Sequence, residues 1–300
     1  DIGDGYKINV CRSKSVTAAY RRKDFIQGDI IMAKRVSLKN KLVFIFGALI
    51  ALASLIEGLL AIRVARRAVT EKIEAHLINK ASDTAEIIDG RANTICQFLE
   101  GIARMPDFAD ETIPYIEKTK LLNKEIAFTN VLYEAAVADM NGYMYSNDNR
   151  VIKIDSYDWY KESIVGKNFL TEPFISVVDD KLILTISVPL YDNKRNIIGV
   201  LAAAIPAKHL SNLIDDIVVG KTGYCYILGL TGTTIASKDF TEVEKMENAQ
   251  DTVKTDSSLE SIAAFEKMAV EIDEPSIGFY EYNGVSKIAS YATMKTTDWT

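Results

Sequence analysis

Hydrophobic side chains follow one another almost without a break over residues 42–62 (LVFIFGALIALASLIEGLLAI), where Glu57 is the only ionisable residue. At a rise of 1.5 Å per residue this run spans about 31 Å, close to the bilayer hydrocarbon core of about 30 Å. A cleaved signal peptide has a shorter apolar region, and a soluble core helix has one apolar stripe. We therefore predict a transmembrane helix over residues 42–62.

Basic residues flank both ends of this segment, so the positive-inside rule does not decide its orientation. The segment before it is short and a large acidic region follows, which favours a cytoplasmic tail over residues 32–41 and an extracytoplasmic domain after residue 62. Glu57 lies close enough to the second interface to reach headgroups or face a partner helix. A functional charge within the membrane is the alternative.

Good helix formers continue without proline from Arg63 to Arg104, and Met105-Pro106-Asp107 ends the pattern. Heptad spacing predicts a narrow apolar seam made of Ile78, Ala81, Ala85, Ile88, Ala92, Ile95, Leu99 and Ile102. A helix this long cannot bury its seam against itself. It must lie along its own domain, pair with a second copy of the chain, or do both.

The pattern after residue 107 changes to short helices and alternating strands. We predict a helix over 110–127 and then strands over 131–139, 143–146, 181–190 and 197–205. Asn141-Gly142 predicts a hairpin turn, and Asp192-Asn193-Lys194 predicts a second turn. These connections are too short for crossover helices, so the strands are expected to be antiparallel.

A similar series follows in the C-terminal third. We predict helices over 208–219 and 258–270 and strands over 223–230, 234–237, 278–282 and 285–293, with a turn at Asn283-Gly284. The repetition indicates two related modules in series rather than one sheet. The predicted fold class is α+β, with one transmembrane helix, a long juxtamembrane helix and two tandem modules with antiparallel sheets.

Several stretches in this order resemble the double Cache sensor domain of bacterial chemoreceptors. They are AVADMNGYMYSND (136–148), SYDWYKES (156–163), LTEPFISVVDDKLILTISVPLYD (170–192), NIIGVLAAAI (196–205), GKTGYCYILGLTGTTIASKD (220–239) and YEYNGVSKIASYATMKTTDW (280–299). The resemblance covers residues 63–300. It implies two PAS-like modules, of which the membrane-distal one binds ligand, and the anchor resembles that of a methyl-accepting chemotaxis protein.

The expected domain boundaries follow from these observations. Residues 1–31 are an N-terminal extension with no assigned role, 32–41 the cytoplasmic tail, 42–62 the transmembrane helix, 63–106 the long helix, 107–207 the distal module and 208–300 the proximal module. The resemblance implies that the proximal module is incomplete at Thr300, before a second transmembrane helix. The expected location is the plasma membrane or bacterial inner membrane, with the sensor extracytoplasmic.

Amino-acid receptors of the resembled family use an Arg-x-Trp-Tyr cluster, a Tyr-x-Asp after a Thr-Glu-Pro turn, and a later aspartate. Trp159 and Tyr160 match the aromatic pair. Tyr157, Phe174, Ser176 and Ala204 stand at the positions of the arginine, the tyrosine and the two aspartates, respectively. Without those charges a zwitterion would be desolvated and largely unpaired, at a cost of several kcal/mol. We therefore expect that the ligand is not an ordinary α-amino acid.

The candidate ligand-binding residues form an aromatic group with few polar members: Tyr157, Asp158, Trp159, Tyr160, Phe174, Ser176 and Ala204, joined by Tyr133 or Tyr145. Aromatic walls suit uncharged or softly cationic ligands, and Asp158 could favour an amine. The alternative is that Trp159 and Tyr160 only pack the core.

Composition narrows the function classes further. The net charge is −6 without a basic stripe in the second half, which argues against nucleic acid as a partner. Three scattered cysteines and two histidines predict neither a disulfide framework nor a metal site, and no cofactor is expected. The 300 residues contain neither a G-x-S-x-G nor an H-E-x-x-H motif, so we expect no enzymatic activity in them.

The sequence therefore predicts the ligand-sensing region of a transmembrane chemoreceptor. Its expected partners are a small molecule, the membrane, a second copy of the chain, and chemotaxis proteins acting through a region beyond Thr300. The alternative is the input domain of a membrane sensor histidine kinase or a cyclic-dinucleotide enzyme.

Overall fold

The computed structural model describes residues 37–300, and the predictions for residues 1–31 and 32–36 lie outside this range. Helix α1 (Leu38–Ala103) contains both the apolar segment and the long helix expected after it. Within the described residues it is the one helix long and apolar enough to cross a membrane, with a mean hydropathy of 2.4 in its most apolar window. None of that window is buried, as expected for side chains that face lipid.

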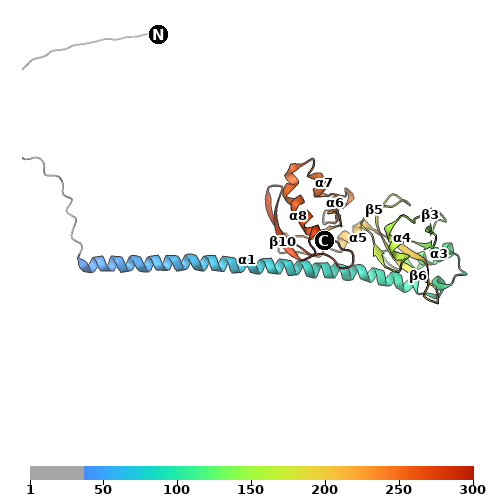
Figure 1. Cartoon of the computed structure of the whole chain (residues 1–300), viewed down its shortest axis with the longest axis horizontal. Coiled ribbons are helices and arrows are strands. Elements are labelled where there is room, and N and C mark those ends of the chain that lie inside the picture. The colour runs from blue at the N-terminus through green and yellow to red at the C-terminus, as the bar shows by residue number, and fades with distance from the viewer. Residues whose placement is uncertain (1–36) are drawn as a thin grey trace, which may run out of the picture. The chain divides into compact units, whose positions relative to one another are not determined.

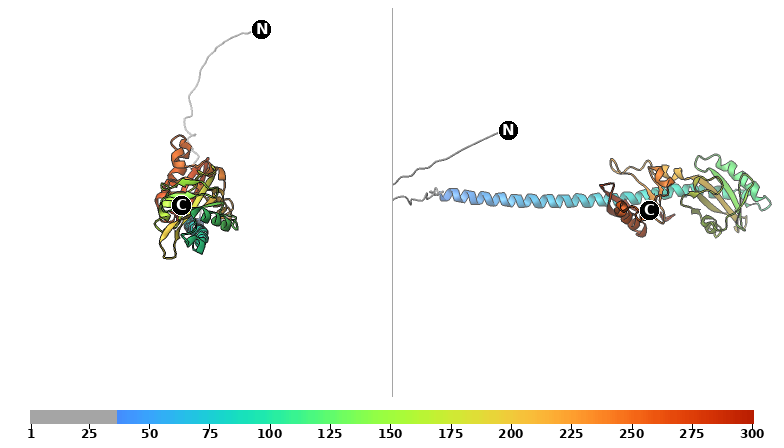
Figure 2. Two further views of the ribbon diagram at one scale, coloured as in Figure 1. Left: turned by 90° about the vertical axis from the view of Figure 1, so that its right-hand side faces the viewer. Right: turned by 90° about the horizontal axis from the view of Figure 1, so that it is seen from above.

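The chain divides into two compact units between Val64 and Ala65. The second unit contains residues 65–103 of α1 and both modules (Figures 1 and 2). Within this unit the two modules follow one another along α1, the proximal module (orange to red) before the distal module (green to yellow).

The distal module is built on one antiparallel sheet in the strand order β3-β2-β1-β7-β6-β4, with β5 also paired to β6. Its strands are β1 (Glu134–Asp139), β2 (Tyr143–Tyr145), β3 (Val151–Lys153), β4 (Phe169–Leu170), β5 (Phe174–Ile175), β6 (Leu182–Tyr191) and β7 (Ile197–Pro206). Its helices are α2 (Pro106–Ala109), α3 (Tyr115–Ile126) and α4 (Asp158–Ser163). The predicted antiparallel strands are confirmed, and β6 and β7 form the longest pair.

Alternation along the strands separates two faces of this sheet. Val137, Ile186 and Leu201 belong to the main core, which also includes apolar residues of α1 and α3. Ala138, Val200 and Ala202 point to the opposite face, where they contact a smaller cluster around Trp159. Because successive side chains of a strand point to opposite faces, the second face is free to form a separate site.

The helix predicted over 110–127 begins later than expected. Asp110 accepts hydrogen bonds from the backbone N–H and hydroxyl of Thr112 (2.8 and 2.7 Å), which fixes a turn, and α3 starts after Pro114. The residue before a proline is sterically disfavoured in helical conformation. The helix therefore starts after Pro114 and does not include the turn at Asp110.

Within residues 65–103, α1 buries one face against the two modules. The buried positions are Thr84, Ala85, Ile88, Ala92, Cys96, Leu99, Ile102 and Ala103. Most of the predicted seam is confirmed, but Cys96 is buried where Ile95 is only half-buried, because the straight helix repeats every 3.6 residues rather than 3.5.

Polar contacts fix this helix in register. The Asp89 carboxylate accepts hydrogen bonds from the backbone of Lys295 and Thr296 (2.6 and 3.2 Å), and Arg91 pairs with Asp216 (3.0 Å).

The proximal module contains two separate two-stranded sheets, β8-β9 and β10-β11. Its elements are α5 (Ala207–Asn212), β8 (Ile227–Leu228), β9 (Thr234–Ala236), α6 (Phe240–Glu244), α7 (Ala249–Thr252), η1 (Ser257–Leu259), α8 (Glu260–Glu271), β10 (Ser276–Tyr282) and β11 (Val285–Tyr291). Thr300 exchanges two backbone hydrogen bonds with Leu228 of β8 (2.6 and 3.0 Å).

Two predicted elements of this module are shorter than expected. The helix over 208–219 ends at Asn212, and the following segment places Asp216 against Arg91 instead of continuing the helix. The strand over 223–230 is reduced to β8, and residues 219–223 form a tight turn with Gly220 at φ +63°.

The Asn-Gly pairs form the predicted turns. Asn283 and Gly284 have φ values of +52° and +71°, as a two-residue type I′ hairpin requires, and they join β10 to β11. Gly142 also has a positive φ, +77°, but the β1–β2 connection is longer, since the Asp139 carboxylate accepts bonds from Asn141 and Tyr143.

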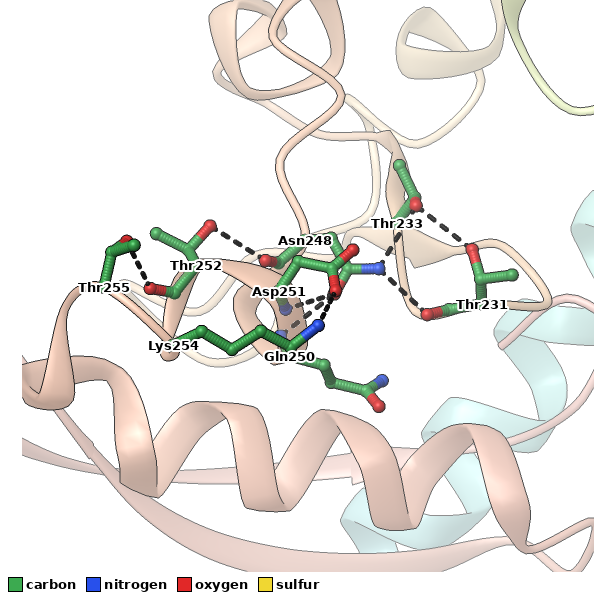
Figure 3. Close-up of polar contacts among 8 residues, drawn as sticks. All are labelled: Thr231, Thr233, Asn248, Gln250, Asp251, Thr252, Lys254 and Thr255. Atoms are coloured by element: carbon green, nitrogen blue, oxygen red, sulfur yellow. Dashed lines mark hydrogen bonds and ion pairs between the residues drawn. The ribbon is translucent and has the colours of Figure 1, made fainter.

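Asn248 connects the β8–β9 turn to α7 (Figure 3). Its side-chain oxygen accepts hydrogen bonds from the backbone of Gln250 and Asp251 (2.9 and 3.3 Å), which caps the helix. Its amide group donates to the carbonyl of Thr231 and the hydroxyl of Thr233 (2.9 and 3.3 Å). One buried side chain thus fixes both the turn and the start of the helix.

Candidate ligand-binding site

The distal sheet carries a cavity on the face that points away from the main core. Its volume is about 70 Å³, and it opens to solvent on one side. Its lining residues come from five strands, from the loops around them and from α4: Tyr133, Glu134, Ala135, Ala136, Met144, Ser146, Ile154, Tyr157, Trp159, Phe174, Ser176, Val177, Val178, Ile183, Thr185, Ala202, Ala203 and Ala204.

Small side chains form the floor of the cavity. Ala136 lies opposite Ala202 across the β1–β7 pair, and Ala204 lies opposite both Glu134 and Thr185. Paired residues of neighbouring strands share one face of a sheet, so these alanines leave space where larger residues would fill it. The space therefore follows from the run of alanines in β7.

Helix α4 supplies the aromatic wall. Trp159 is 4% exposed, and its ring centroid lies 6.2 Å from that of Tyr157. The backbone carbonyl of Trp159 accepts a hydrogen bond from the Ser187 hydroxyl (2.9 Å), which accepts one from the Ser163 hydroxyl (2.8 Å). Both serines are fully buried, so the wall is held against β6 by satisfied polar contacts.

Five of the seven predicted site residues line the cavity: Tyr157, Trp159, Phe174, Ser176 and Ala204. Of the two further tyrosines considered, Tyr133 lines the cavity. Tyr145 does not, since it stacks on Tyr115 and donates a hydrogen bond to Asp139 (3.1 Å).

The other two candidate residues, Asp158 and Tyr160, do not line the cavity. Successive residues of a helix point about 100° apart, so with Trp159 directed inward its neighbours point elsewhere. Asp158 faces solvent and pairs with Lys161 (3.0 Å), and its side chain is 78% exposed. Tyr160 is buried beside the cavity and donates a hydrogen bond to the carbonyl of Asp139 (3.0 Å).

Sequence reasoning missed the polar lining residues Glu134, Ser146 and Thr185. Glu134 is the first residue of β1 and is half-buried. The alternation of the strand could have placed it on the same face as Ala136 and Ala138, once the direction of the cavity was known.

Charged groups gather at one edge of the cavity. The Tyr133 hydroxyl and the Lys181 ammonium group both contact the Asp179 carboxylate. The Lys181 Nζ atom also lies 4.1 Å from the centroid of the Tyr133 ring. Burial opposes the charge of Asp179, but the contacts from Tyr133 and Lys181 prevail and lower the pKa of Asp179 to about 2. Arg150 pairs with Asp148 (2.5 Å) and donates a hydrogen bond to the carbonyl of Val178 (3.3 Å).

The turn preceding Phe174 joins the two modules. The Glu172 carboxylate accepts a hydrogen bond from the backbone N–H of Leu230 (2.6 Å) in the proximal module. A Cβ atom on Gly229 would lie 2.5 Å from this carboxylate, so a larger residue there would displace the Glu172 side chain from its present position. A cavity residue therefore lies two positions from a contact between modules.

Comparison with known families identifies the fold. The family model described as the Cache domain, in its double form, matches residues 61–300. The chain belongs to the Cache domain family. The match begins at the end of the apolar segment and includes both modules, which confirms the resemblance seen in the sequence.

Two curated relatives are chemoreceptors of Bacillus subtilis (strain 168). The methyl-accepting chemotaxis protein TlpA is 29% identical over 164 residues, which cover 54% of this chain and 22% of TlpA. The methyl-accepting chemotaxis protein McpB is 30% identical over 90 residues, 29% of this chain and 13% of McpB. The chain thus matches less than a quarter of the length of these relatives.

Solved sensory domains share the fold at lower identity. The domain of the Pseudomonas fluorescens chemoreceptor CtaA with L-isoleucine has a TM-score of 0.60 and 18% identity, covering 78% of this chain and 92% of that one. The sensory domain of the Campylobacter jejuni chemoreceptor Tlp3 with isoleucine has a TM-score of 0.56 and 17% identity. The match covers 78% of this chain and 92% of that one. The ligand-binding domain of the Pseudomonas aeruginosa chemoreceptor PctB with L-Arg has a TM-score of 0.55 and 18% identity. The match covers 76% of this chain and 93% of that one.

Proposed function

We propose that residues 63–300 are the extracytoplasmic ligand-sensing region of a membrane-anchored chemoreceptor. The observation that carries this proposal is the cavity in the distal module of a Cache domain that follows an apolar helix. The chemoreceptor relatives support it.

In this proposal each part of the chain has its own role. Residues 42–62 anchor the protein in the plasma membrane or inner membrane, residues 107–207 bind ligand, and residues 208–300 connect the ligand-binding module to the anchor. A ligand shifts the balance between two packing states only by its difference in affinity for them. The contact between Glu172 and Leu230 is a direct connection along which such a shift reaches the proximal module.

The ligand contacts Tyr157, Trp159, Phe174, Ser176 and Ala204 and is not an ordinary α-amino acid. No arginine or lysine lines the cavity within the described residues, so a ligand carboxylate would lack a partner. Although CtaA, Tlp3 and PctB were solved with amino acids, their identity of 17–18% to this chain supports the fold and not the ligand.

A second copy of the chain is the expected protein partner. Val69, Ile73, Ile87 and Phe98 are exposed apolar residues of α1 between residues 65 and 103, and they offer a surface for another α1 helix. Signalling to chemotaxis proteins and the absence of enzymatic activity are further parts of the proposal.

Filling the cavity tests the function. We expect Ala204→Phe to keep the fold, since Ala204 borders open space, and to abolish ligand binding. The control Val165→Phe adds the same ring at a position that is 66% exposed in the same module. A panel of amines, alcohols, organic acids and amino acids is screened by thermal shift with the full chain in non-ionic detergent.

The proposal predicts that at least one compound stabilises the unsubstituted protein and Val165→Phe but not Ala204→Phe. Stabilisation of all three proteins alike, or of none by any compound, would contradict a ligand site in this cavity. Micromolar binding of several common amino acids would contradict the predicted ligand class.

A further inference from the structure

The charge at the distal cavity is unbalanced. Of the side chains that line it within the described residues, Glu134 is the one that carries a charge. Glu134 belongs to none of the ion pairs among residues 37–300, although it is half-buried. An unpaired carboxylate in a partly desolvated position is costly unless a cation comes to it.

The neighbouring cations are already engaged. Arg150 pairs with Asp148 at 2.5 Å, and Lys181 pairs with Asp179 at 2.9 Å. The three carboxylates Glu134, Asp148 and Asp179 therefore face two cations, which leaves one negative charge, on Glu134. Burial raises the pKa of Glu134, and the negative charges of Asp179 and Asp148 raise it further. The positive charges of Arg150 and Lys181 lower it by less.

The remaining walls suit a cation better than an anion. Trp159, Tyr157 and Phe174 present aromatic rings to the cavity, and the faces of such rings attract ammonium groups. The hydroxyl groups of Ser146, Ser176 and Thr185 also line the cavity, and they can accept a hydrogen bond from a ligand hydroxyl or N–H.

We propose that the distal cavity binds a small organic ammonium ion that lacks a carboxylate, held between the aromatic wall and the carboxylate of Glu134. This inference rests on the proposed function of the same cavity. It moves the anionic contact from Asp158, which faces solvent, to Glu134.

Two pairs of probes test the charge requirement without any substitution. Choline and 3,3-dimethylbutan-1-ol have the same shape and differ in whether the central atom is a charged nitrogen or a neutral carbon. Benzylamine and benzyl alcohol form a second pair. With the full chain in dodecyl maltoside, calorimetry is expected to show a cation of one pair binding about tenfold or more tightly than its neutral partner.

A pair of variants tests the role of Glu134. Glu134→Gln keeps the shape and is expected to weaken binding of that cation about tenfold or more, while leaving the neutral partner unaffected. Asp158→Asn removes an exposed carboxylate from the same module and is expected to change neither affinity.

Equal affinities within both pairs, or an unchanged cation affinity in Glu134→Gln, would overturn the inference. If no amine of the panel binds, while a compound without an ammonium group binds in a manner that Ala204→Phe abolishes, the inference fails and the proposed function stands. If no compound of any class binds in that manner, both fail.

Discussion

At the scale of single residues, burial of one carboxyl group gives the proximal module a pH dependence. Glu266 on α8 is 4% exposed, and burial raises its pKa to about 7, while the Tyr226 hydroxyl lowers it and Glu242 raises it further. Tyr280 also lies near this carboxyl group. The folded state therefore holds a proton that the unfolded state, with a pKa near 4.5, has already released.

This linkage has a definite sign. Between about pH 4.5 and pH 7 the folded state binds more protons, so the free energy of unfolding decreases as pH rises through this window. The difference of about 2.5 pKa units corresponds to about 3 kcal/mol at most. We expect Glu266→Gln to stabilise the protein by about 1–3 kcal/mol at pH 8 and to have little effect at pH 4.

Guanidinium unfolding at both pH values, followed by tryptophan fluorescence, measures this effect. Glu260→Gln replaces an exposed carboxylate on the same helix and serves as control. Parallel pH profiles of the unsubstituted protein and Glu266→Gln would show that Glu266 is not the titrating group.

The candidate site was partly predictable at this scale. The family motif located Tyr157, Trp159 and Phe174, because motif order in the chain reflects position in the fold. It did not determine where Asp158 and Glu134 point, since that depends on how α4 and β1 are rotated against the cavity. The phase of α4 and the alternation of β1, and not residue type, decided which carboxylate reaches the site.

At the scale of elements, predictability followed length. The strands β6 and β7 contain ten residues each, and their apolar pattern was sufficient to place them. Strands of two or three residues, such as β3, β4 and β5, are too short to show a period, and their pairing with longer strands creates them. Neither α6 nor α7 was predicted, for the same reason.

The buried face of α1 gives a prediction at this scale. Ile88 is 2% exposed and its neighbour Ile87 is 46% exposed. We expect Ile88→Ala to lower the free energy of unfolding by about 2–5 kcal/mol, because it leaves a cavity against the modules. Ile87→Ala removes the same atoms from the open side of the helix and is expected to change monomer stability by less than about 1 kcal/mol.

Urea unfolding at low protein concentration measures both changes, and sedimentation velocity measures association. In the proposed dimer Ile87→Ala weakens association of two chains while Ile88→Ala weakens the monomer. Equal losses of monomer stability for the two variants would contradict the packing of α1 described above.

At the scale of the whole molecule, the proposed topology places a membrane between the tail and the Cache modules. The apolar segment of α1 has no buried residues, while residues 84–103 of the same helix bury a continuous face against folded modules. Such a contrast is expected of a helix that crosses a membrane with its first segment and packs on folded protein with its second.

Labelling of introduced cysteines in intact cells tests this arrangement most directly. After the native cysteines are replaced by alanine, Asp158→Cys places a thiol on the exposed side of the distal module, and Lys39→Cys places one before the apolar segment. We predict that a membrane-impermeant maleimide labels Asp158→Cys in intact cells and labels Lys39→Cys only after permeabilisation. Protection of Asp158→Cys until the cells are opened would contradict an extracytoplasmic sensor.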